Sequence, residues 1–140
     1  MRIFTGGLAL AAAGCMAEPG GSVIKPGDAL PSFIVTLSDG TELSSATVAG
    51  QGGVICFFNT ACGDCRATLP RLQARYESGE RIWCISREES ALSVDAYWQA
   101  NGLTMPWSAQ EGREVYSLFA HSGIPRQYTV APGGTVTAVE

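Results

Sequence analysis

The fold is decided by residues 54–65, VICFFNTACGDC, in which an apolar run leads directly to two cysteines separated by two residues. Residues 54–58 predict a buried strand, and a helix-compatible stretch, 66–76, follows the second cysteine at once. Cys62 should therefore lie at a helix N-terminus, where unpaired N–H groups and the helix dipole favour negative charge. Because the thiolate is the nucleophile in disulfide exchange, this arrangement indicates thiol–disulfide chemistry at Cys62 and Cys65.

The same cysteine spacing occurs in zinc sites and in structural disulfides. A structural zinc ion needs a second pair of ligands. Here Cys56 and Cys84 stand singly in apolar runs, and His121 is the only histidine. A structural disulfide is disfavoured because the pair follows a strand and opens a helix, which is an accessible position. We therefore favour a redox role and expect no metal.

The first residues of the chain indicate export. The apolar and small-residue stretch 3–13 is too short to span a bilayer, but it has the length of a signal-peptide core. It ends in AAGC at 12–15, which is similar to the lipobox of bacterial lipoproteins, with Ala in place of the usual Leu. The similarity implies a signal peptide over 1–14 and a lipid on Cys15. An ordinary secretory cleavage that leaves Cys15 as a free thiol is the alternative.

The composition indicates one acidic domain. The formal net charge of −4 and the lack of any basic run argue against a nucleic-acid partner. No segment after the leader is long and apolar enough for a membrane span, so a lipid anchor is the expected membrane contact. Residues 15–26 predict a flexible tether. Residues 27–140 are enough for one domain and too few for two.

Strand and helix signals alternate through this domain. A short hairpin is expected from strands at 33–37 and 41–43 around the turn at 38–40. The later elements are expected at 54–58, 66–76, 81–86, 93–101, 113–120, 127–130 and 135–139. Strands that alternate with helices and close in an antiparallel hairpin predict an α/β domain with three layers.

Local signals refine three of these elements. Residues 50–53, with three glycines, are expected to break the chain before the buried strand. Ser93 is expected to cap the helix that follows it. The helix at 113–120 is expected to bury Val115, Leu118 and Phe119.

The order of these parts resembles the thioredoxin-like fold, and within it the TlpA/ResA-type thiol–disulfide oxidoreductases. The most specific elements are FFNTACGDCR at 57–66, Leu69-Pro70, and the GIP segment that contains Ile124 and Pro125. The resemblance implies a central mixed sheet with helices on both faces and an N-terminal β-hairpin extension. It also implies a first helix bent by its proline and a cis bond before Pro125. In the family, the backbone at Ile124 and Pro125 aligns the substrate as an added strand.

Several positions depart from the family pattern. Ala61 stands where a Trp is common, and Thr68 stands where many ResA-type proteins have an acid. Asp64, between the cysteines, disfavours a further negative charge beside it. Arg126 follows the proline and either lies near the sulfurs or is a solvated surface residue. The sequence stops at Glu140, before the terminal helix that most relatives have, so either the domain is minimal or the sequence is a fragment.

Two further cysteines stand at positions of interest. By the resemblance, Cys56 occupies the place of a buried acid in thioredoxins proper, and Cys84 falls near the lysine that partners this acid. The two thiols therefore replace an ion pair beneath Cys65, or they are small buried hydrophobic residues. We favour the second interpretation, because most free cysteines are of that kind.

The resemblance implies an exported enzyme that needs no metal or organic cofactor. Cys62 attacks a substrate disulfide and Cys65 resolves the mixed disulfide, which leaves a redox-active Cys62–Cys65 disulfide. The expected partners are protein disulfides or dithiols and a redox partner that resets the pair. We expect a monomer that faces the periplasm, is lipid-anchored to the bacterial cell envelope, and acts as a reductant in preference to an oxidant.

Two other functions remain open. A peroxiredoxin-type peroxidase shares the fold, but Asn59 stands where such proteins carry a Thr. A Sco-like copper-binding module uses two cysteines with three intervening residues and a distant histidine. The cysteines here have two intervening residues, and His121 is expected at a helix C-terminus instead.

Overall fold

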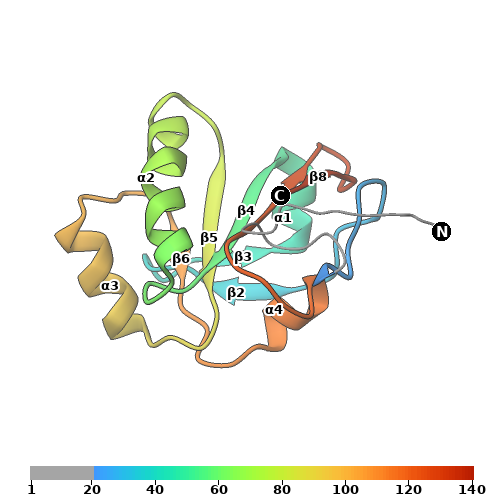
Figure 1. The fold of residues 1–140 in the computed structure, drawn as a ribbon. Helices are drawn as coiled ribbons and strands as arrows, with labels where there is room; N and C mark the ends of the chain where they lie inside the picture. The colour runs from blue at the N-terminus through green and yellow to red at the C-terminus, as the bar shows by residue number, and fades with distance from the viewer. Residues whose placement is uncertain (1–20) are drawn as a thin grey trace.

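The computed structural model describes residues 21–140 (Figure 1). Its elements are, in chain order, β2 (Ile34–Thr36), β3 (Glu42–Ser44), α1 (Ser45–Gln51), β4 (Gly53–Phe58), α2 (Gly63–Glu77), β5 (Ile82–Ser86), α3 (Ala91–Ala100), β6 (Trp107–Ser108), α4 (Glu114–Phe119), β7 (Arg126–Val130) and β8 (Val136–Val139). The predicted signal peptide and Cys15 lie outside the described residues. Within residues 21–140, no helix combines the length and the apolar character that a membrane span requires.

A five-stranded sheet with the order β6-β5-β4-β7-β8 forms the centre of the domain. Strands β6, β5 and β4 run parallel, whereas β7 is antiparallel to both β4 and β8. Strand β4 lies in the middle, and every residue from Val54 to Phe58 is buried. This burial explains the continuous apolar run, since a central strand is covered on both of its faces. The predicted mixed sheet is confirmed.

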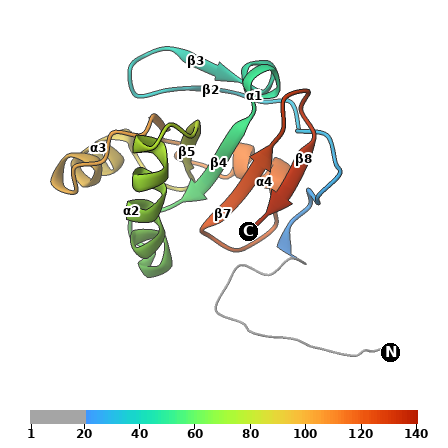
Figure 2. The same ribbon diagram turned by 90° about the horizontal axis from the view of Figure 1, so that it is seen from above.

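Helices cover both faces of this sheet (Figures 1 and 2). On the side of α2 and α3, the buried cluster contains Cys56, Cys65 and Cys84, and we call this side the thiol face. On the side of α1 and α4, the cluster contains Phe57 and Phe119 with other aromatic rings, and we call this side the aromatic face. The predicted three-layer arrangement is confirmed.

The predicted N-terminal hairpin is also present. Strands β2 and β3 pair antiparallel as a separate two-stranded sheet, with Val35 opposite Leu43. Both side chains are buried and join the cluster of the aromatic face. In the turn, the Asp39 carboxylate accepts the Thr41 N–H at 2.9 Å, which is the local bonding that favours Asp in turns.

Helix α1 was not expected, because its one buried residue, Val48, gives no periodic apolar pattern. Ser44 caps this helix, and its hydroxyl accepts the Thr47 N–H at 3.2 Å. The predicted break at residues 50–53 is confirmed, because α1 ends at Gln51, Gly52 is its C-cap, and Gly53, with a φ of 152°, begins β4. A Cβ atom on Gly53 would lie 2.7 Å from the Trp83 ring, so a larger residue does not fit.

Two predicted helix details are wrong. Ser93 is not the N-cap of α3; the cap is Ser90, whose hydroxyl accepts the Ser93 N–H at 3.2 Å. Helix α4 buries Tyr116 and Phe119, while Leu118 is 42% exposed. The reason is the i, i+3 spacing of Tyr116 and Phe119, which places these two side chains on the face of α4 that packs against the sheet.

The end of the predicted tether packs on the domain. Gly21 and Ser22 are buried, and Ser22 forms an antiparallel bridge with Ala120. The Ser22 hydroxyl is 2.7 Å from the hydroxyl of Tyr128, in the core of the aromatic face. A flexible tether was expected as far as residue 26, so these contacts correct its extent.

Candidate active site

The first cysteine lies where the sequence placed it. Cys62 is the N-cap of α2, and its Sγ accepts the Cys65 N–H at 3.2 Å. The Cys62 N–H donates to the Asn59 carbonyl at 3.1 Å, which closes a tight turn after β4. Cys62 is half-buried, whereas Cys65 is fully buried. One sulfur is thus accessible from solvent, and the other lies behind it in the thiol face.

A buried carboxylate holds the turn that precedes Cys62. Glu89 is 8% exposed, and its carboxylate accepts the Thr60 N–H at 2.8 Å and the Thr60 hydroxyl. The Ser93 hydroxyl also donates to Glu89, at 2.6 Å. On the other side of Thr60, the Arg66 guanidinium donates to its carbonyl at 2.6 Å. The Thr60 peptide is therefore held between an anion and a cation.

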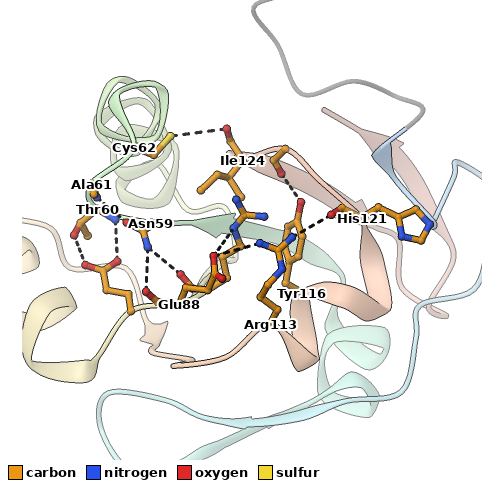
Figure 3. A network of polar contacts seen from close by, with 12 residues as sticks. Asn59, Thr60, Ala61, Cys62, Glu88, Arg113, Tyr116, His121 and Ile124 are labelled. Carbon is orange, nitrogen blue, oxygen red and sulfur yellow. Dashed lines mark hydrogen bonds and ion pairs between the residues drawn. The ribbon is translucent and has the colours of Figure 1, made fainter.

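Asn59 links the same turn to the end of β5. Its side-chain oxygen accepts the Ala61 N–H at 2.8 Å, and its NH₂ group donates to the Arg87 carbonyl at 3.0 Å. Figure 3 shows Asn59, Thr60 and Ala61 together on the approach to Cys62. At this end of β5, Glu88 adopts a positive φ of 56°, which is uncommon for a residue other than glycine.

The loop after α4 lies against Cys62. The Ile124–Pro125 peptide bond is cis, as the family resemblance implied. The Cys62 thiol lies 3.8 Å from the Ile124 carbonyl oxygen and points toward it in Figure 3. The Tyr116 hydroxyl donates to the neighbouring Gly123 carbonyl at 2.7 Å. Helix α4 thus ties the loop to the aromatic face.

A second set of contacts joins this loop to the end of β5 (Figure 3). Arg113 lies 3.3 Å from the Glu88 carboxylate and donates to the His121 carbonyl at 3.1 Å. The guanidinium groups of Arg87 and Arg113 stack on the Tyr116 ring, at 4.6 and 5.2 Å from its centre. His121 follows α4, as expected, and enters the network through its backbone; its side chain is exposed.

The second cysteine is held in its neutral form. Burial raises the pKa of the Cys65 thiol above its ordinary value of 9.0, and its hydrogen bond with Cys62 raises it further. A hydrogen bond from the Asn59 backbone acts in the opposite direction but is a smaller effect. Cys65 therefore carries its proton at neutral pH.

The other two cysteines meet below Cys65, as predicted. Cys56 on β4 and Cys84 on β5 are Cα partners in the parallel register, and neither is exposed. Burial raises the pKa of both thiols above 9.0. All four described cysteines are free thiols. Within residues 21–140, no group of three or more His, Cys, Asp or Glu is placed to hold a metal ion.

Arg126 occupies neither of the two positions considered for it. Its side chain is 1% exposed, so it is not a solvated surface residue. It shares a side of β7 with Tyr128 and Val130, which belong to the aromatic face, and therefore points away from Cys65. Its Nε donates to the Ser122 carbonyl at 2.8 Å. The guanidinium thus holds the loop before Pro125 from the side of the aromatic face.

The profile of the AhpC/TSA family matches residues 26–139. The chain belongs to the AhpC/TSA family. Among curated relatives it is similar to the thiol-disulfide oxidoreductase ResA of Oceanobacillus iheyensis, with 27% identity over 125 residues, 84% of this chain and 65% of the relative. The ResA of Bacillus thuringiensis is 23% identical over 114 residues, 79% of this chain and 66% of the relative. The chain thus spans just under two thirds of the length of these members.

Solved structures show the same fold. A thio-disulfide isomerase from Thermus thermophilus superposes with a TM-score of 0.69 at 28% identity, covering 84% of this chain and 86% of that one. The thioredoxin domain of a thiol-disulfide oxidoreductase from Bacteroides vulgatus gives a TM-score of 0.71 at 19% identity, covering 84% and 89%. These similarities confirm the thioredoxin-like fold predicted for this AhpC/TSA member.

The residues that support the two cysteines were not predicted from the sequence. Glu89 and Tyr116 were not singled out, and Asn59 was considered only as a departure from peroxidases. A signal for Glu89 was present, since two consecutive acids, 88–89, follow a buried strand at the sheet end where Cys62 also lies. No comparable signal identifies Tyr116, because its partner is a backbone carbonyl seven residues away.

Proposed function

We propose that this chain is a thiol–disulfide oxidoreductase that acts on protein substrates through Cys62 and Cys65. The observation that carries the proposal is the position of the Cys62 sulfur. It caps α2, accepts the Cys65 N–H at 3.2 Å, and lies 3.8 Å from the Ile124 carbonyl. The helix N-terminus directs a backbone N–H toward this sulfur, and the thiolate is the attacking form in disulfide exchange. The names of the ResA relatives support the same chemistry.

The reaction consists of two exchanges. The Cys62 thiolate attacks one sulfur of a substrate disulfide, so the substrate S–S bond breaks, a mixed disulfide forms and a substrate thiolate leaves. Cys65 then loses its proton and attacks the Cys62 sulfur, which releases the second substrate sulfur as a thiolate. The substrate gains two electrons, and the chain ends with a Cys62–Cys65 disulfide. These steps require only the two sulfurs of the chain, so no metal or organic cofactor takes part.

The substrate is proposed to bind along the loop at Ile124 and Pro125. Its backbone would add to this loop as an extended strand, which brings the substrate disulfide to Cys62. We infer that the chain works as a monomer in the reducing direction. A separate redox partner would then return the Cys62–Cys65 disulfide to two thiols.

Export and anchoring form a separate part of the proposal. The sequence before residue 21 supports a signal peptide over 1–14 and a lipid on Cys15. The domain would then face the periplasm from the bacterial cell envelope, where disulfides persist. Growth with a radiolabelled fatty acid tests this, because label should enter the wild type and not Cys15→Ala. Equal label in both would contradict the anchor.

Insulin reduction with the protein supplied in its reduced form tests the catalytic proposal. Cys62→Ser should reduce no insulin, because the accessible nucleophile is lost. Cys65→Ser should form a stable adduct with insulin that dithiothreitol releases, because no thiol of the chain resolves it. Cys84→Ala is the matched control and should reduce as much insulin as the wild type. Insulin reduction by Cys62→Ser would contradict the proposal.

Two further measurements separate the proposal from its alternatives. The reduction potential of the Cys62–Cys65 pair against glutathione gives the direction, and a potential close to that of strong oxidants would contradict a reductant. Consumption of hydrogen peroxide by the reduced protein is expected to be no faster than that of a small free thiol. Rapid consumption that depends on Cys62 would support a peroxidase instead.

A further inference from the structure

The thiol face contains two cysteines that the proposed exchange does not use. Cys56 and Cys84 are paired in register on β4 and β5, and Cys65 from α2 joins them in the same buried cluster. All three side chains have no exposed surface. The position beneath the resolving cysteine is thus occupied by uncharged thiols.

Few polar groups near Cys65 affect the pKa of its thiol. The groups that act on it are the Cys62 thiol, the Asn59 backbone N–H and the Cys56 thiol. The rest of its buried cluster consists of apolar side chains such as Leu69 and Phe58. Within residues 21–140, none of the groups that act on Cys65 is a carboxylate.

The charged side chains at this end of the sheet are engaged elsewhere. From α2, Asp64 is exposed, and Arg66 bonds the Thr60 carbonyl and stacks on Tyr97 of α3. Ahead of α3, the Glu89 carboxylate is occupied by Thr60 and Ser93.

The two strands beneath α2 offer no charge either. On the side of the sheet that faces Cys65, β4 presents Val54, Cys56 and Phe58. Strand β5 presents Ile82 and Cys84 on the same side. Among the described residues, the titratable groups that these two strands place under Cys65 are therefore thiols.

This arrangement matters in the second exchange. The Cys65 thiol must lose its proton before its sulfur bonds to Cys62 and the substrate thiolate leaves. A carboxylate beside the thiol would accept this proton within the protein. In its absence the proton passes to solvent, and the fraction of reactive thiolate follows the solution pH.

We propose that Cys56 is a positioning residue that places an uncharged thiol, and no carboxylate, beneath Cys65. The Cys65 thiol must then lose its proton to solvent. Because this loss is unfavourable at neutral pH, the mixed disulfide is long-lived there. The inference rests on the proposed function and concerns its second step alone. Resolution of the mixed disulfide is then the slow step, and its rate rises with pH. The chain holds its protein substrate covalently for most of each cycle.

Single-turnover reaction with Ellman's reagent tests both steps separately. The first thionitrobenzoate release reports attack by Cys62, and the second reports resolution by Cys65. From about pH 6 to about pH 9 the second rate should rise about tenfold per pH unit, as thiolate ionisation does. Cys65→Ser should show the first release only. Two releases with a second rate independent of pH would overturn the inference and leave the proposed function standing; a second release in Cys65→Ser would overturn the assignment of roles.

A gained carboxylate provides the sharper test. Cys56→Asp should accelerate the second release at least tenfold at neutral pH and flatten its pH profile. Cys56→Asn has nearly the same shape without the charge, and should keep the steep profile. Equal profiles in the two folded variants would overturn the inference.

A second pair of variants avoids burying a charge in the core. Thr68 is half-buried and lies three residues after Cys65 on α2, so the two side chains lie on the same side of the helix. Thr68→Glu should accelerate the second release, and Thr68→Gln should not. Equal second rates in Thr68→Glu and Thr68→Gln would likewise show that proton loss by Cys65 does not limit resolution, and the inference would be wrong.

Discussion

The two faces of strand β4 differ in what they bury, although they share one backbone. Phe57 points to the aromatic face and has ring neighbours at 4.8, 5.5 and 6.0 Å, which belong to Phe119, Tyr116 and Tyr128. Cys56, one residue earlier, points to the thiol face beneath Cys65. Successive side chains of a strand point to opposite faces of the sheet, so neighbouring residues of β4 belong to a cluster of aromatic rings and to a cluster of sulfurs.

This difference indicates that the two faces contribute to different properties of the protein. Aromatic pairs in edge and tilted contacts stabilise a fold beyond the area that they bury. The rings also fix the loop beside Cys62, because Tyr116 is one of them and donates to Gly123. The thiol face contributes smaller side chains around the reactive sulfurs. We therefore expect the aromatic face to determine stability and the thiol face to determine chemistry.

The largest expected effect is the loss of the central ring. Phe57→Ala should lower the free energy of unfolding by about 3–5 kcal/mol, because it leaves a cavity among three rings. Cys56→Ala on the other face should cost only about 1 kcal/mol. Urea unfolding at neutral pH measures both. Equal losses would contradict the division between the faces.

Alkaline pH should lower the free energy of unfolding through the buried cysteines of the thiol face. Burial raises the pKa values of Cys56, Cys65 and Cys84 above 9.0, so the folded protein keeps protons that the unfolded chain releases. Stability is therefore unaffected by these groups below about pH 9 and falls as the pH rises above it. Cys84→Ala should reduce this slope by up to about 1.4 kcal/mol per pH unit. Urea midpoints at a series of pH values measure the slope, and an unchanged slope in the variant would exclude Cys84 as a contributor.

Removal of one hydroxyl should have a smaller effect. Tyr116→Phe deletes the hydrogen bond to the Gly123 carbonyl and should cost about 1 kcal/mol. The attack rate at Cys62 should also fall, because the loop beside it is held less firmly. Tyr97→Phe, on the thiol face, is the matched control: its ring still stacks on Arg66 and its stability should be unchanged. A larger loss of stability in Tyr97→Phe than in Tyr116→Phe would contradict the expectation that the aromatic face determines stability.

The smallest effect is expected when a thiol reagent is added to the folded protein and reaction at Cys56 and Cys84 is measured. Cys56 and Cys84 are fully buried, so a slow alkylating reagent should not modify them in the folded protein, even after mild oxidation. Addition of denaturant should make both reactive, which mass spectrometry detects. A Cys56–Cys84 disulfide found beside Cys62–Cys65 would show instead that the thiol face contains a second redox centre.

Most of the fold was predictable because its signals are local. The buried strand at 54–58 and the cysteine spacing were enough to place Cys62 at a helix start. Helix α1 was missed because its only buried residue is Val48, which gives no periodic pattern. Ser90 and Ser93 are both good capping residues, and the choice between them depends on where the chain leaves the sheet.

The supporting residues of the site were less predictable because their partners are distant in sequence. Glu89 bonds Thr60 across 29 positions, and nothing near either residue shows this pairing. Arg126 was misjudged for a similar reason, since long charged side chains are usually exposed and its burial depends on the loop that folds over it. Chemistry at the cysteines follows from spacing, whereas the contacts that position them follow from topology.

The packing of residues 21–24 determines how a mechanical load would enter this domain. The Gly21 carbonyl accepts the His121 N–H at 2.7 Å, and the Val23 N–H donates to the Phe119 carbonyl at 2.8 Å. Tension on the chain that precedes Gly21 would therefore act first on the end of α4 and the loop that carries Ile124. The central sheet would bear it only afterwards. A pull from the N-terminal side would displace the neighbour of Cys62 before it unfolded the strands that hold the cysteine itself.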